Sequence, residues 1–158
     1  MKQLAFLIVA LCAIPTIGRA QEPVIPDGGF AAFGYGFGCG APAPMTMIPQ
    51  FVVENDGREE TFDVVQLPAS TVGAVMVFGD MLGNFPLDDY GMPGCIVYIT
   101  QSYFSWPLTL NGSTASATFE VGPLPLIDLF WQAFALAPAA NAAGIVSSNA
   151  LWWQPGDA

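Results

Sequence analysis

Prolines recur so closely along this chain that no long helix fits between them. Between residues 49 and 138 they stand at positions 49, 68, 86, 93, 107, 123, 125 and 138. Proline has no backbone N–H and clashes with the preceding turn of a helix. The segments that remain are short and rich in β-branched and aromatic residues, which favours strands. The sequence therefore predicts an all-β fold.

Turn residues divide these segments at the spacing typical of a two-sheet sandwich. We predict strands at residues 45–54, 59–67, 74–78, 95–103, 106–110, 115–121, 130–137 and 144–152. Asn55-Asp56-Gly57 and Asn111-Gly112 are hairpin turn signals. Together these features predict a two-sheet antiparallel β-sandwich, either Ig-like or jelly-roll-like.

The segment Leu126–Ala137 is apolar enough to form a helix instead of a strand. Its aromatic residues and the prolines on either side favour a strand. Gln132 then points across the sheet or into a partly buried site, where neighbouring backbone must satisfy its amide.

Residues 1–20 have the three regions of a secretory signal peptide. Lys2 gives a short basic start, an apolar run from Leu4 to Ile14 follows, and Gly18-Arg19-Ala20 is a small-x-small cleavage site. The apolar run is well short of the ~20 residues that span a bilayer, which disfavours a membrane anchor. Cys12 raises the alternative of a lipoprotein, but Leu11 before it is not the small residue of such signals. We therefore expect a secreted or cell-surface protein, in the bacterial extracellular space or periplasm.

Signal cleavage would leave 138 of the 158 residues, which is the size of one domain. The start of this part alternates glycine with aromatic residues, and we expect its aromatic side chains to fold over the sandwich. The expected division is a signal peptide at 1–20, a flexible N-terminal arm at 21–34, the β-sandwich at 35–153 and a C-terminal tail at 154–158.

Signal cleavage also removes Cys12 and leaves two cysteines, Cys39 and Cys95. An exported chain with two cysteines has one possible intramolecular pairing, so we predict one disulfide between them. Cys95 follows a tight turn with Gly91, Pro93 and Gly94, and it opens an apolar strand. A metal site is the alternative, but two cysteines without histidine make a poor zinc set.

Several short motifs follow one another between Tyr35 and Leu151. They are Tyr35-Gly-Phe-Gly-Cys39-Gly, Phe85-Pro-Leu-Asp88, Tyr90-Gly-Met-Pro-Gly-Cys95, Pro123-Leu-Pro-Leu, Phe130-Trp-Gln132-Ala, Ala140-Asn141-Ala-Ala-Gly144 and Ser147-Ser-Asn149-Ala-Leu151. In this order and spacing the chain resembles a family of secreted bacterial β-sandwich domains of uncharacterised function. The resemblance implies the same disulfide and the same sandwich, and it implies no known activity.

The chain expected after cleavage is strongly acidic. It retains one basic residue, Arg58, against thirteen Asp and Glu, so that its formal charge is −12. Nucleic acids and anionic membranes are therefore excluded as expected partners, because almost nothing can neutralise phosphates. We attribute the charge first to solubility, since 53% of the residues are hydrophobic.

Most catalytic arrangements are missing from the sequence. The chain has no histidine, which excludes His-dependent triads and histidine-bound metals. No phosphate-binding loop of the GxxxxGK type occurs. Two carboxylate pairs, Glu59-Glu60 and Asp88-Asp89, are candidates for glycoside hydrolysis. Because neighbouring residues of a strand face opposite sides, neither pair is expected to converge on one substrate.

Two kinds of binding site remain as hypotheses. Asp80, Asp88 and Asp89 are weak candidates for calcium ligands, but their spacing matches no EF-hand loop, and a solvated acidic loop with an Asx-type turn is favoured. Aromatic rings can stack on carbohydrate, which makes Trp106, Trp131, Trp152 and Trp153 candidates. We expect Trp131 in the core.

The last predicted strand decides between the two C-terminal tryptophans. Regular alternation would place Ile145, Ser147, Asn149 and Leu151 on one face, and Val146, Ser148, Ala150 and Trp152 on the other. Trp153 would then emerge beside Leu151 at the strand end, where no apolar residue follows to cover it. We predict Trp153 as the exposed binding residue, with Trp152 as the second candidate.

These observations predict a secreted, non-catalytic binding or structural module without a cofactor. A surface glycan or an extracellular protein is the expected partner. The alternative is a glycan-active hydrolase that uses carboxylates.

Overall fold

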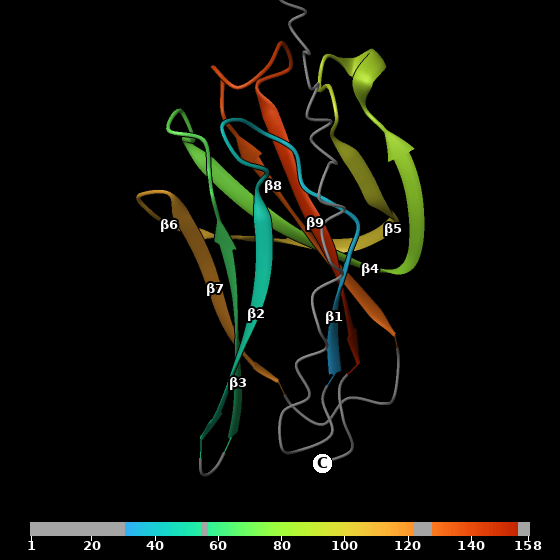
Figure 1. The fold of residues 1–158 in the computed structure, drawn as a ribbon. Coiled ribbons are helices and arrows are strands. Elements are labelled where there is room, and N and C mark those ends of the chain that lie inside the picture. Colours follow the sequence, from blue (N-terminus) through green and yellow to red (C-terminus); the bar gives the residue numbers. More distant parts are fainter. Residues whose placement is uncertain (1–30, 55–56, 122–127, 155–158) are drawn as a thin grey trace, which may run out of the picture.

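The computed structural model describes residues 31–54, 57–121 and 128–154, and they form an almost entirely antiparallel β-structure (Figure 1). The elements are β1 (Ala31–Tyr35), β2 (Thr46–Glu54), β3 (Gly57–Val65), β4 (Gly73–Pro86), the 3₁₀ helix η1 (Asp88–Tyr90), β5 (Ile96–Pro107), β6 (Thr109–Asn111), β7 (Thr114–Val121), β8 (Leu129–Leu136) and β9 (Ile145–Gln154). The all-β prediction is confirmed, and within the ambiguous segment residues Leu129–Leu136 form the strand β8. In the described part of the chain, no helix is long and apolar enough to cross a bilayer.

The strands form two antiparallel sheets. The order is β1-β9-β8-β4-β5 in the five-stranded sheet and β2-β3-β7-β6 in the four-stranded sheet. The two sheets pack face to face, with β2, β3, β6 and β7 on the left of Figure 1. The predicted hairpin between β2 and β3 is confirmed because Glu54 pairs with Gly57, although Asn55 and Asp56 lie outside the described residues.

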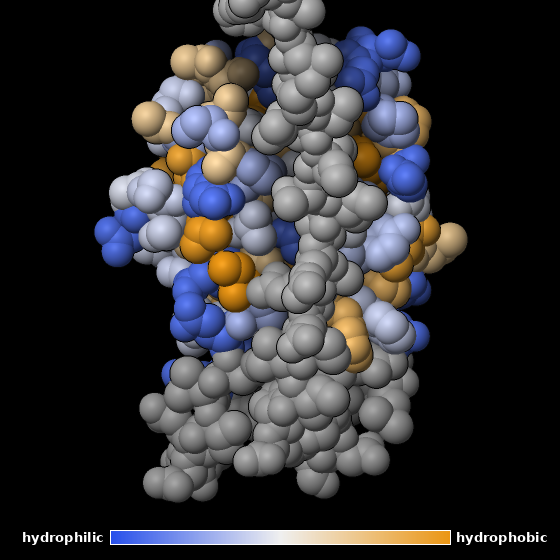
Figure 2. All heavy atoms as spheres, viewed as in Figure 1, coloured by the Kyte–Doolittle hydropathy of each residue, from blue (hydrophilic) through white to orange (hydrophobic). Residues whose placement is uncertain are grey.

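The core lies between the two sheets and is built from alternate residues of each strand. Phe62 of β3 packs on Trp131 of β8, with ring centroids 5.2 Å apart. Around them, β8 contributes Ala133 and Ala135, which are fully buried and small enough for the sheets to approach. Burial of each large apolar side chain contributes about 1.5–3 kcal/mol to folding. On the face drawn in Figure 2, hydrophobic residues form small groups between hydrophilic ones.

β9 contains a β-bulge, so its side chains do not alternate regularly between the two faces as the sequence predicted. Ala150 pairs with Gln132 whereas Ser147 pairs with Phe134, so two residues of β9 stand opposite one residue of β8. Val146 and Leu151, five residues apart, are therefore both in the core, although a regular strand would place them on opposite faces. The hydroxyl of Ser148 accepts the N–H of Ala133 at 2.9 Å and supplies the partner that the ladder lacks there.

The β4–β5 hairpin is much longer than predicted. Residues 79–86, expected to be part of an acidic loop, continue β4 and pair with β5 through several register shifts. In Figure 1, β4 crosses behind the other strands and then curves upward to η1. Gly79 lies at one of these shifts, where an added Cβ would come within 1.8 Å of the Gln101 carbonyl oxygen. Here glycine permits the close approach of two strands rather than ending a strand.

The predicted flexible arm also needs a correction. Residues 31–34 were assigned to it, but they belong to β1, which pairs with β9 from Ala31↔Gln154 to Tyr35↔Ala150. The cause is the free edge of β9, which offers backbone partners that a local pattern cannot reveal. The predicted signal peptide at 1–20, residues 21–30 and the tail residues 155–158 lie outside the described residues.

Candidate functional site

The predicted disulfide between Cys39 and Cys95 is present and buried. The two Cα atoms are 4.9 Å apart, and the bond joins the segment after β1 to the segment before β5. Ser147 of β9 supports it: its N–H donates to Cys39 Sγ at 3.1 Å, and its carbonyl accepts the Cys39 N–H at 2.8 Å. The disulfide is a structural cross-link between the two segments.

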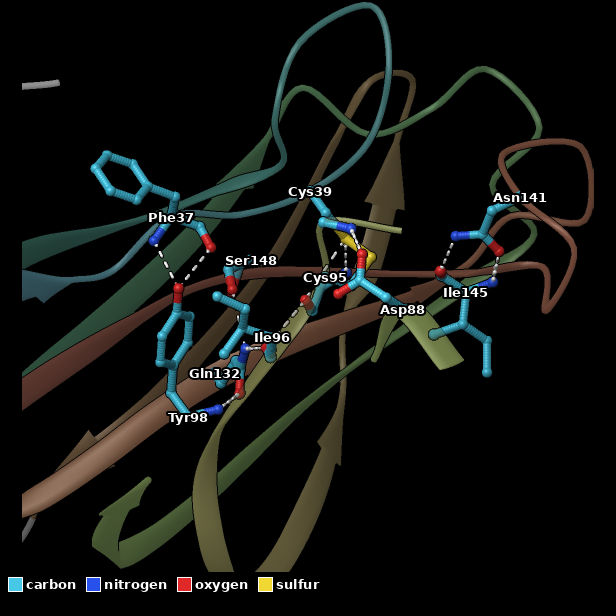
Figure 3. The surroundings of a disulfide bond; sticks show 12 residues. Phe37, Cys39, Asp88, Cys95, Ile96, Tyr98, Gln132, Asn141, Ile145 and Ser148 are labelled. Carbon is cyan, nitrogen blue, oxygen red and sulfur yellow. Dashed lines mark hydrogen bonds between the residues drawn. A yellow bond between two sulfur atoms is a disulfide. The ribbon is translucent and has the colours of Figure 1, made fainter. Parts of the chain in front are cut away.

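Gln132 behaves as the sequence predicted, with its side chain fully buried and bonded to backbone. Its Oε1 accepts the N–H of Tyr98 at 2.9 Å, and its Nε2 donates to the carbonyl oxygens of Ile96 at 2.7 Å and Ser148 at 3.0 Å (Figure 3). The amide thereby fastens the start of β5 onto the outer face of β8 and β9. Its hydrogen bonds make it a structural residue.

Asn149 makes a comparable link on the inner side. Its Oδ1 accepts the N–H of Met47 at 2.7 Å, and its Nδ2 donates to the Met47 carbonyl at 3.4 Å. Because Met47 belongs to β2, this side chain connects the two sheets through the backbone of the four-stranded one. A buried polar side chain of this kind specifies how the sheets dock.

The prediction of an exposed Trp153 is wrong. Trp153 is only 2% exposed and packs edge-on against Trp131, with ring centroids 6.1 Å apart. It shares the core face with Leu151 as predicted, but the opposite sheet and Trp131 cover it. Trp152 points the other way and is partly buried. Its ring centroid lies 5.3 Å from that of Phe33, and its Nε1–H donates a hydrogen bond to Asp128 Oδ1 at 3.1 Å. Of the two C-terminal candidates, Trp152 is the one that solvent reaches.

The three proposed calcium ligands occupy two different elements. Asp80 lies in β4, whereas Asp88 and Asp89 lie in η1. Asp88 accepts the N–H of Gly94 at 3.1 Å, which closes the loop before Cys95 over six residues rather than as a local Asx turn. Across residues 31–54, 57–121 and 128–154, no three His, Cys, Asp or Glu side chains are grouped closely enough to hold a metal ion.

The carboxylate pair Glu59-Glu60 is split between the faces of β3. Glu60 is buried, whereas Glu59 is partly exposed on the other side. This is the separation expected of neighbouring residues on a strand.

Three aromatic side chains lie together at the exposed edge of the five-stranded sheet. Tyr103, Phe104 and Trp106 of β5 are 53%, 46% and 43% exposed, and we call them the β5 aromatic surface. Of these, the sequence had singled out Trp106 alone. The centroid of the Phe104 ring lies 6.1 Å from that of Trp106. β5 is an edge strand of this sheet and pairs with β4 on one side only.

Partly buried rings that pack on the core support this surface from below. Phe104 packs edge-on against Phe78 with centroids 3.9 Å apart, and Trp106 meets Phe119 of the other sheet at 5.7 Å. Phe78 and Phe119 in turn contact Trp131 at 4.9 Å and 5.4 Å. A continuous aromatic cluster therefore runs from the centre of the core to the solvent, and the exposed rings rest on fixed neighbours.

Asp80 borders the surface and interacts with Tyr103. The pKa of Tyr103 is raised above its ordinary value of 10.0, chiefly because the phenol donates a hydrogen bond to Asp80. Partial burial and the negative charge of Asp80 act in the same direction. At neutral pH the pair offers a phenol oxygen and a carboxylate beside the aromatic rings.

Sequence reasoning missed Tyr103 and Phe104 because it ended one strand at residue 103 and began the next at residue 106. The signal was nevertheless in the sequence. Residues 100–107 read TQSYFSWP, with no charged residue, no glycine and one proline at the end, which is typical of one continuous strand. The eight residues are all exposed.

The chain was compared with family models, curated proteins and solved structures, and none of them matches it.

Proposed function

We propose that this chain is a secreted, non-catalytic binding module and that it binds its ligand through the β5 aromatic surface. The observation that carries the proposal is the exposure of three neighbouring aromatic residues, Tyr103, Phe104 and Trp106, on one strand. Large apolar side chains that gather at the surface of a soluble protein mark binding sites more often than chance. Aromatic residues are also the residues that dominate binding energies.

The rigidity of this surface supports the proposal. Phe104 and Trp106 rest on Phe78 and Phe119, which belong to two different sheets. A ligand that binds there need not order flexible side chains, so little binding energy is lost to side-chain entropy. Sites on strands of a scaffold are held more accurately than sites on loops.

Export of the protein is supported by its disulfide and by its sequence. The Cys39–Cys95 bond fits an extracellular or periplasmic protein, because disulfides persist in oxidising compartments. The apolar run and cleavage motif of residues 1–20 supply the expected route.

The placement of the acidic side chains favours binding over hydrolysis. Asp80 bonds to Tyr103, Asp88 bonds to the Gly94 backbone, and Asp63 accepts a hydrogen bond from Gln50. These carboxylates lie on three different elements, and each serves a local contact. A retaining or inverting hydrolase needs two carboxyl groups on either side of one bond.

The test compares Trp106→Ala with Phe37→Ala, which removes an exposed aromatic ring outside the β5 aromatic surface. Both variants and the original chain are screened against a panel of polysaccharides and extracellular proteins. We expect Trp106→Ala to weaken binding at least tenfold, as truncation of a central aromatic residue does, and Phe37→Ala to leave it unchanged. Equal binding by all three proteins would contradict the proposed surface. Release of reducing ends from a polysaccharide would support the hydrolase alternative.

A further inference from the structure

We infer that the ligand of the β5 aromatic surface is a neutral glycan, whose apolar ring faces stack on Phe104 and Trp106 and whose hydroxyls bond to the Tyr103–Asp80 pair. This inference rests on the proposed function, and it names the chemical class of the ligand.

The backbone of the hairpin brings the polar pair next to the aromatic rings. Phe78 pairs with Phe104, whereas Gly79 pairs with Ser102, so Tyr103 is an extra residue at a β-bulge. On a regular strand Tyr103 and Phe104 would face opposite sides. At the bulge both rings reach Phe78, with centroid distances of 6.0 Å and 3.9 Å. Bulges that redirect a side chain in this way are common beside functional sites.

The surface matches the two-sided chemistry of a sugar. Phe104 and Trp106 are two residues apart on one strand, and their rings form an apolar platform of two faces inclined at 58° to each other. Beside it, the Asp80 carboxylate has lone pairs beyond the one that accepts from Tyr103, and the phenol oxygen can accept as well. Stacking on aromatic rings combined with hydrogen-bond acceptors at their edge fits a ligand with apolar ring faces and donor hydroxyls.

Charge decides which glycans fit. The whole chain contains thirteen Asp and Glu and three basic residues, and Asp80 borders the platform itself. Polysaccharides that carry carboxylates or sulfates would be repelled, because no cluster of cations compensates them. A neutral glycan meets no such penalty.

Area argues against a folded protein as the partner. Aromatic side chains bury roughly 150–250 Å² each, so three rings at about half exposure offer roughly 300 Å². A stable protein interface needs about 800 Å² from each partner. A narrow oligosaccharide, in contrast, can be held by two or three stacked rings.

The experiment measures binding of the exported, oxidised protein to neutral oligosaccharides of glucose, xylose and mannose, to polygalacturonate, and to a panel of extracellular proteins. We expect saturable binding to at least one neutral series that persists at high salt. Trp106→Ala should weaken it at least tenfold, while Tyr103→Phe and Asp80→Asn should each weaken it about three- to tenfold, because each removes a polar contact but leaves the platform. Circular dichroism spectra and melts establish that each variant is folded.

The outcomes separate this inference from the function on which it rests. The protein could instead prefer polygalacturonate, or bind a protein alone, and lose this binding with Trp106→Ala. That result would support the β5 aromatic surface as the binding site and contradict the neutral glycan as its ligand. Neutral glycan binding that is lost with Trp106→Ala but unchanged by both Tyr103→Phe and Asp80→Asn would overturn the role of the polar pair. Glycan binding that survives Trp106→Ala would remove the proposed surface itself.

Discussion

The ring of Trp153 meets that of Trp131 inside the core at an interplanar angle of 80°, with the centroids 6.1 Å apart. This contact makes the last tryptophan of the chain a core residue. We expect Trp153→Ala and Trp131→Ala each to lower the free energy of unfolding by about 3–5 kcal/mol, as truncation of a buried tryptophan does. Trp152→Ala, at a partly exposed site, should cost clearly less. Denaturant melts measure all three, and a loss below about 1 kcal/mol for Trp153→Ala would contradict the packing.

Gln132 provides a second stability test because three backbone groups depend on its amide. Gln132→Leu introduces an apolar side chain of similar size and leaves the Tyr98 N–H and the Ser148 carbonyl without this partner, whereas the Ile96 carbonyl still accepts from the Ser147 hydroxyl at 3.2 Å. Each buried group left unsatisfied costs about 1–3 kcal/mol, so we expect a total loss of at least about 2 kcal/mol. Gln101→Leu, at an exposed position of β5, is the matched control and should change stability by less than about 0.5 kcal/mol. Equal melting of the two variants would show that the amide contributes little.

Tyr103 should titrate at a higher pH than an ordinary tyrosine. Its neutral phenol donates to Asp80, and ionisation would place two negative charges side by side. Because the pKa of Tyr103 is raised in the folded state, the Tyr103–Asp80 interaction stabilises the folded protein below pH 10. This stabilisation disappears as the pH rises through the folded-state pKa. Ultraviolet difference titration of the original chain against Tyr103→Phe isolates the residue. Asp80→Asn should lower the pKa of Tyr103 toward its ordinary value, and an unchanged titration would contradict the contact.

We expect calcium to add little stability. Asp80 lies in β4 and interacts with Tyr103, whereas Asp88 and Asp89 lie in η1. Asp88 accepts a hydrogen bond from the Gly94 N–H. Thermal melts with calcium and with magnesium test this expectation. A melting temperature that rises and saturates with calcium but not with magnesium would make these aspartates ligands after all.

The exported protein should begin at Gln21 and contain no free thiol. The proposed signal cleavage after Ala20 would remove Cys12, and Cys39 and Cys95 are bonded to each other. Intact mass and thiol titration under denaturing conditions decide both points. Replacing both remaining cysteines with serine should cost about 2–4 kcal/mol. Two titratable thiols in exported, oxidised material would contradict the pairing.

Local pattern and cysteine number were sufficient to predict the sandwich and the disulfide. Strands such as β7 and β8 match their predicted ranges within a residue or two, because alternation and flanking turn residues are local properties. The Cys39–Cys95 pair followed because only two cysteines remain after cleavage. Gln132 was predicted to bond to backbone because a strand with buried neighbours leaves a polar side chain no other partner.

What the sequence did not reveal depends on contacts between distant segments. Gly79 and Gly83 were taken as loop residues, yet both belong to β4 beside β5. The bulge that places Val146 and Leu151 on one face depends on the register between β8 and β9. The burial of Trp153 depends on Trp131, and the exposure of Tyr103 depends on a bulge opposite Gly79. None of these partners is a sequence neighbour, so no local period could reveal them.

The pairing of β1 with β9 has a consequence for the order in which the chain can fold. Ala31 reaches its partner Gln154 only when more than a hundred residues between them have been made or delivered. Cys39 likewise depends on β9, because both the N–H and the carbonyl of Ser147 form hydrogen bonds with it. A chain that emerges from its amino end can therefore form the β2–β3 hairpin early, but it cannot close its larger sheet until the last strand arrives. Such long-range closure slows folding, and it would keep the chain open during the export that we propose.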